Sequence, residues 1–108
     1  MKQAPIFTQT YSFSSWLLDH LEKMKSYTIL KETLGNTCLE FLESITLALK
    51  GCEKQTHIRN ADNRLAYLKI LLRLAEEKEM LTTNQYHFSL ECLDDIGRQS
   101  GAWKKATT

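Results

Sequence analysis

Cysteines and histidines are the residues of this chain that could most readily bind a metal ion or act as a nucleophile or base. The cysteines are Cys38, Cys52 and Cys92, and the histidines are His20, His57 and His87. They form no Cys-x-x-Cys pair and no cluster with the spacing of metal ligands. We interpret the cysteines as small buried hydrophobic residues and His20 as a residue at the border of a helix face with a local hydrogen bond. No metal or cofactor is expected.

Catalytic motifs are also missing from the sequence. It contains no Gly-rich phosphate loop, no His-Glu-x-x-His and no nucleophile elbow. The acidic residues at 76–79 and 94–95 are typical of solvated helix faces, and Arg73 can pair with Glu76 or Glu77 one turn later. Such exposed pairs contribute only about 0.2–1 kcal/mol. We therefore predict that the protein is not an enzyme.

The segment 61–80 gives the strongest helix signal of the chain. Its first apolar set recurs every three or four residues, at Ile58, Ala61, Leu65, Leu68, Leu72 and Ala75. A second apolar set lies on another arc of the same helix, at Tyr67, Ile70, Leu71, Leu74 and Leu81. A helix at the edge of a monomeric bundle normally has a broad polar side, which this helix lacks. The pattern predicts that the first set packs in a bundle core and that Tyr67, Ile70, Leu71 and Leu74 form an oligomer interface.

Two further helices are predicted before this segment. The first begins near Tyr11 or Ser12, with Thr10 or Ser12 as its N-cap. Thr28 can cap the second helix, which Gly51 ends in a left-handed conformation. The segment 61–80 then belongs to a third helix.

The start of the third helix and the fourth helix have their own signals. Thr56 can cap the third helix, and Thr82 with Gln85 has the spacing of a capping box at the start of the fourth. Gly97 and Gly101 in the fourth helix indicate close approach of a neighbouring helix, with fraying of the last turn as the alternative.

Composition limits the chain to one ordinary globular domain. It has 108 residues, 43% of them hydrophobic and 25% charged, and a formal net charge of +1. Four glycines and one proline leave little material for turns, so we predict an all-α, up-down-up-down four-helix bundle over residues 9–105. Residues 1–8 are expected to be a flexible arm and residues 106–108 a disordered tail. No segment has the length or apolar character of a membrane span or signal core, so a cytoplasmic location is expected.

Four segments of the sequence carry a family resemblance. They are Trp-Leu-Leu-Asp-His-Leu-Glu-Lys at 16–23, the stretches 61–65 and 68–75, the stretch 81–86 and the end at 95–103. In this order they resemble the four-helix-bundle accessory variability determinants of diversity-generating retroelements. The same bundle occurs in proteins encoded by intervening sequences of 23S ribosomal RNA genes.

This resemblance implies a non-enzymatic partner of a reverse transcriptase, assembled as a pentameric ring with a basic surface for RNA or DNA. Lys69 and Arg73 match the basic pair that the family carries on its third helix, and Arg98 matches a basic position of the fourth. Lys104 and Lys105 extend the candidate contact. Such residues bind phosphates in a salt-sensitive way that is independent of base sequence.

Two departures from the family pattern bear on these expectations. Asp19 replaces a proline of the first motif, and Tyr-Thr-Ile-Leu-Lys-Glu at 27–32 replaces the Arg-rich, Leu-Gly-containing entry to the second helix that is frequent in the family. With a net charge of only +1, nucleic-acid affinity is expected to be weaker than in basic members or to be supplied mainly by the polymerase. Lys69 and Arg73 as plain solvated charges are the alternative interpretation of the candidate site. The alternative function is a structural or protein-interaction bundle of the intervening-sequence type, without a nucleic-acid role.

Overall fold

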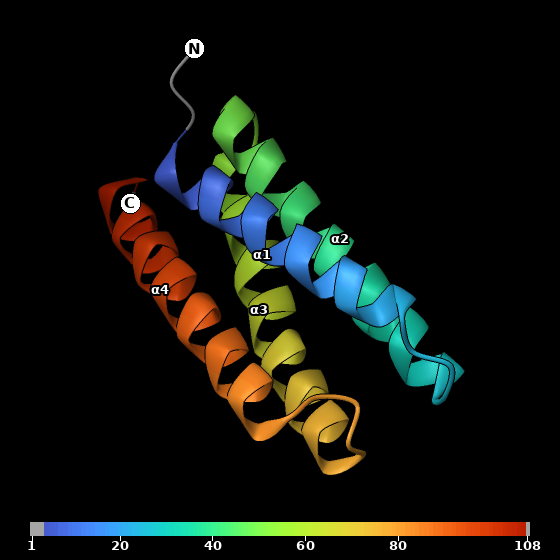
Figure 1. Ribbon diagram of the computed structural model, residues 1–108. Helices are drawn as coiled ribbons and strands as arrows, with labels where there is room; N and C mark the ends of the chain where they lie inside the picture. Colours follow the sequence, from blue (N-terminus) through green and yellow to red (C-terminus); the bar gives the residue numbers. More distant parts are fainter. Residues whose placement is uncertain (1–3, 108) are drawn as a thin grey trace.

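Four α-helices make up the part of the chain that the computed structural model describes, residues 4–107. They are α1 (Pro5–Glu22), α2 (Thr28–Lys50), α3 (Lys54–Glu77) and α4 (Thr83–Thr107). The short connections 23–27, 51–53 and 78–82 make successive helices run in opposite directions (Figure 1). The prediction of an all-α four-helix bundle is confirmed.

The hydrophobic core lies between all four helices. α1 packs against α2 and α4, and α3 packs against the same two helices from the other side. The largest apolar side chains with almost no exposure are Leu17, Leu34, Phe41, Ile45, Ile58, Leu68, Leu72, Leu93 and Ile96. Burial of one such side chain contributes about 1.5–3 kcal/mol before conformational entropy is subtracted. The first apolar set of α3 is therefore a core face, as its spacing predicts.

The start of α1 differs from its prediction. The helix begins at Pro5, because proline lacks the N–H that the first turn leaves unpaired and its φ already suits a helix. Thr10, predicted as an N-cap, is buried inside the helix, and its hydroxyl donates a hydrogen bond to the Ile6 carbonyl at 2.7 Å. Ser12 also lies within the helix. The expected flexible arm over residues 1–8 is thus wrong from Pro5 onward, and residues 1–3 lie outside the described chain.

The starts of α2 and α3 also need correction. Thr28 is the first residue of α2, and the N-cap is Tyr27 in a left-handed conformation with φ of 56°. α3 begins at Lys54 after Glu53, whose φ is 51°, so Thr56 lies inside the helix. No side chain of the described residues caps either helix.

Two end signals are confirmed. Gly51 ends α2 with φ of 90°, a conformation that glycine adopts without steric cost. The capping box before α4 is formed in both directions: Thr82 N donates to Gln85 Oε1 at 2.9 Å, and Gln85 N donates to Thr82 Oγ1 at 3.1 Å.

The second half of α4 shows where its glycines matter. A Cβ at Gly97 would lie 3.1 Å from Leu65 Cδ2, so the predicted close approach of a neighbouring helix is confirmed there. At Gly101 nothing lies within 4 Å, and the prediction is wrong for that residue. α4 continues to Thr107, so the expected tail at 106–108 is helical up to that residue, and residue 108 lies outside the described chain. In residues 4–107, no helix is long and apolar enough to cross a membrane.

Candidate nucleic-acid and partner interface

The outward side of α3 exposes large apolar side chains. Tyr67, Ile70 and Leu74 are 44%, 63% and 39% exposed. Leu71, predicted to join them, is only 5% exposed and belongs to the core, which corrects its assignment. Leu71 lies about 60° from Leu68 on the helix circumference, so both side chains lie on the face that packs in the core. Leu81 lies in the connection after α3 and is buried, so it also leaves the predicted set. The second apolar arc therefore consists of Tyr67, Ile70 and Leu74.

This outward side continues as an apolar groove between α3 and the start of α2. The groove has a volume of about 590 Å³ and is lined by Tyr27, Thr28, Ile29, Leu30, Thr33, Tyr67, Leu71, Leu74 and Lys78. Ile29, on its rim, is 82% exposed. A contiguous apolar surface on a soluble helical domain is typical of a contact with another protein surface. Spacing within α3 predicted one wall of the groove, and the contribution of α2 was missed.

Lys69 and Arg98, two of the candidate cations, lie at the seam between α3 and α4. Lys69 Nζ lies 2.7 Å from Asp94 Oδ1, and Arg98 lies 3.2 Å from Asp95. The hydrogen bond from Lys69, and then its charge, lower the pKa of the Asp94 carboxyl, and the charge of Arg98 lowers it further. Lys69 and Arg98 are thus close to the same carboxylate, which already binds one of them.

The other candidate cations lie farther along the same two helices. Arg73 pairs with Glu77 on its own helix at 3.5 Å, and Lys104 Nζ lies 3.3 Å from Asp62 Oδ2. Lys105 is exposed in the last turns of α4. The five cations therefore form a strip along α3 and α4 rather than one cluster. We call Lys69, Arg73, Arg98, Lys104 and Lys105 the basic strip, and the first four of them have carboxylate partners in the same chain.

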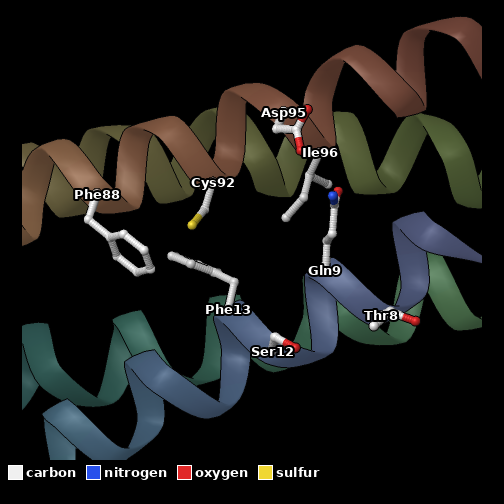
Figure 2. Close-up of a pocket in the computed structure, with 8 residues that line it drawn as sticks. All are labelled: Thr8, Gln9, Ser12, Phe13, Phe88, Cys92, Asp95 and Ile96. Carbon is white, nitrogen blue, oxygen red and sulfur yellow. The ribbon is translucent and has the colours of Figure 1, made fainter.

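A hollow between α1 and α4 was not predicted from the sequence (Figure 2). It has a volume of about 250 Å³ and is lined by Thr8, Gln9, Ser12, Phe13, Phe88, Cys92, Asp95 and Ile96. Burial raises the pKa of the Cys92 thiol, and the charges of Glu91 and Asp95 raise it further. A raised pKa keeps the thiol protonated and weakly nucleophilic. Cys92 is therefore not an activated nucleophile in this hollow.

The remaining cysteines and histidines have structural surroundings. Cys38 is buried, as predicted, whereas Cys52 is exposed and corrects the prediction for that residue. His20 is half-buried, and its Nε2 donates to the Met80 carbonyl at 3.0 Å, so its hydrogen bond joins the end of α1 to the connection 78–82 rather than being local. Among residues 4–107, no three His, Cys, Asp or Glu side chains gather at a position that could hold a metal ion.

Comparison with known proteins shows the family of this chain. The family model described as bAvd-like matches residues 6–107, which is almost the whole chain. The chain belongs to the bAvd-like family. The search of curated proteins and the search of solved structures each gave no match. The resemblance seen in the sequence is thereby confirmed for this bAvd-like protein, across all four helices.

Proposed function

We propose that this bAvd-like protein is a non-enzymatic accessory factor of a diversity-generating retroelement. It binds the reverse transcriptase and the template RNA or DNA in the cytoplasm and supports mutagenic copying into a variable gene. The observation that carries this proposal is the family match over residues 6–107, together with four sequence motifs in family order along the same helices.

The apolar groove supports the oligomeric part of the proposal. Tyr67, Ile70 and Leu74 expose apolar area on α3, and Ile29 extends it onto α2. Covering this area with a second copy removes it from water, which is the main driving force of most association. A ring of copies, five by resemblance, also repeats every basic side chain around one assembly, which increases its effective affinity for a polyanion.

The ion pairs of the basic strip favour the second candidate function, a protein-interaction bundle without a nucleic-acid role. A phosphate that approaches Lys69 or Arg73 has to compete with Asp94 or Glu77. Exposed pairs of this kind are weak, so the competition reduces phosphate binding without abolishing it. The two functions therefore differ in whether the protein binds RNA, and the accessory role also requires binding of the reverse transcriptase.

The test combines capture of the polymerase with RNA binding. The protein, immobilised through a tag, is expected to retain the reverse transcriptase of its retroelement after nuclease treatment, and to bind RNA in a salt-sensitive way. The double variant Lys69→Glu/Arg73→Glu should weaken both while its far-UV circular dichroism and size are unchanged. Lys50→Glu/Arg59→Glu is the matched control, since it changes the same charge at exposed positions outside the strip.

The outcomes separate the candidate functions. Failure to retain the polymerase contradicts the accessory role. Retention of the polymerase without any RNA binding supports the protein-interaction bundle. If Lys69→Glu/Arg73→Glu performs as well as the parent in both assays, the basic strip is a solvated face.

A further inference from the structure

Three exposed lysines gather at the end of the bundle opposite the start of α1 and the end of α4, and Figure 1 shows the connections of this end. The connections 23–27 and 78–82 meet there around a hollow of about 560 Å³, which we call the basic hollow. It is lined by His20, Lys23, Met24, Lys25, Ser26, Tyr27, Lys78, Glu79 and Met80. Lys23, Lys25 and Lys78 are exposed, and none lies within 4.0 Å of a carboxylate of residues 4–107.

The basic hollow and the basic strip differ in what an incoming anion meets. Along the strip, Asp94, Glu77 and Asp62 already bind the cations. In the hollow, Glu79 is the one carboxylate among the lining residues, against three lysines. A phosphate that approaches one of these lysines therefore does not have to displace a carboxylate partner first, as it does along the strip.

Tyr27 gives the hollow an aromatic surface. Its side chain is 50% exposed, and its backbone is left-handed with φ of 56°, a conformation that non-glycine residues seldom adopt. Asn or Gly would adopt this backbone conformation with less strain, so the conformation of the turn does not explain a tyrosine at this position. Its exposure beside Lys23 and Lys25 leaves the ring open to a planar ligand.

We propose that the basic hollow binds single-stranded nucleic acid, with phosphates on Lys23, Lys25 and Lys78 and one base stacked on Tyr27. Positive charge interleaved with an exposed aromatic ring is the arrangement that binds single strands without sequence preference. Lysine acts on phosphate as a point charge, and the hollow contains no arginine to fix a carboxylate or a base edge in two-point contact. This inference rests on the proposed function for its choice of nucleic acid over an acidic protein.

Helix packing makes the site a junction of two parts of the chain. His20 Nε2 donates to the Met80 carbonyl, and Lys31 Nζ donates to the Met24 carbonyl at 3.1 Å. These hydrogen bonds anchor the backbone of both connections, which carry two of the three lysines next to the third. Tyr27 and Lys78 also line the apolar groove, so a ring built through that groove would place a basic hollow at each subunit boundary.

The experiment measures binding of fluorescein-labelled oligouridine by anisotropy at increasing salt. Lys23→Gln/Lys25→Gln/Lys78→Gln should weaken binding by about tenfold or more at low salt and reduce the slope of log K against log salt by about 2. The variant Lys69→Gln/Arg73→Gln/Arg98→Gln removes three positive charges from the basic strip, and it should weaken binding less than the basic-hollow variant does, because each of these cations already pairs with a carboxylate.

Stacking is tested separately at Tyr27. Tyr27→Phe keeps the ring and should bind like the parent, whereas Tyr27→Asn suits the left-handed backbone and should lose about fivefold or more in affinity. The same Tyr27→Asn variant should bind double-stranded RNA like the parent, because paired bases are not free to stack. Far-UV circular dichroism of every variant confirms that the helices are retained.

Three results would overturn the inference. They are no oligouridine binding by the parent, a greater loss with the basic-strip variant than with the basic-hollow variant, and equal binding of polyglutamate and oligouridine. The first result would also contradict the RNA-binding part of the proposed function. The other two overturn only the basic hollow, because a parent that binds oligouridine and retains the reverse transcriptase still meets the proposed function.

Discussion

The inward and outward faces of α3 have similar residues and opposite environments. Leu68 and Leu72 lie in the hydrophobic core and are fully buried, whereas Ile70 and Leu74 on the outward face are 63% and 39% exposed. The same residue types thus stabilise the bundle on one face and leave an uncovered apolar surface on the other. α3 therefore contains more apolar residues than the core of one bundle can bury. The buried residues stabilise the fold, and the exposed ones are available for contact with another protein surface.

The largest effect on folding is expected from the inward face. Leu72→Ala should reduce the free energy of unfolding by about 2–5 kcal/mol, because it removes buried methyl groups and leaves a cavity. Urea denaturation followed by circular dichroism measures the change. Leu39→Ala is the control, since Leu39 is 48% exposed and should cost well under half as much. Equal losses for the two variants would contradict the assignment of Leu72 to the core.

The packing of α3 against α4 can be tested at the two glycines of α4. Gly101→Ala should stabilise the protein by about 0.4–1 kcal/mol, because alanine restricts the unfolded chain and nothing lies within 4 Å of the new Cβ. Gly97→Ala should gain less or destabilise, since its Cβ would lie 3.1 Å from Leu65 Cδ2. The comparison uses thermal unfolding, and an equal gain at both positions would rule out close packing at Gly97.

The smallest effect belongs to the ion pair between Lys69 and Asp94. The lowered pKa of Asp94 means that its contribution to stability is present above the unfolded value and is lost as pH falls through the folded value. Asp94→Asn should therefore be slightly less stable than the parent at neutral pH and equal to it in strong acid. Asp19→Asn, an exposed carboxylate outside the ion pairs of residues 4–107, is the control. A difference between Asp94→Asn and the parent that persists in acid would contradict this account.

Local sequence signals predicted much of the fold. Three/four spacing gave the core face of α3, and Gly51 and the Thr82–Gln85 capping box marked helix ends, because each signal acts within one or two turns. Local signals do not predict the start of α1, because Ile6 and Thr10 continue its buried face through a stretch without clear periodicity. The N-caps Tyr27 and Glu53 are not predictable either, because neither is a usual residue for a left-handed backbone.

The candidate site was less predictable, for a different reason. Lys69 pairs with Asp94 and Lys104 with Asp62, across 25 and 42 positions of the chain, so the neutralisation of the basic strip depends on how the helices pack. The basic hollow likewise joins residues 20–27 with 78–80. Leu71 shows that spacing within one helix is also insufficient. It lies on the border between the two arcs, so the packing of the neighbouring helices decides whether it is buried.

Assembly size is the most direct test of the claim that the outward face of α3 is a contact surface. Light scattering at micromolar concentration should give several times 12.5 kDa for the parent, with five copies favoured by family resemblance. Leu74→Glu should reduce the mass to that of one chain while the helical signal remains, and Leu39→Glu, at a similarly exposed position on α2, should keep the assembly. A parent that is a monomer, or a Leu74→Glu variant that keeps the parent's mass, would contradict the account.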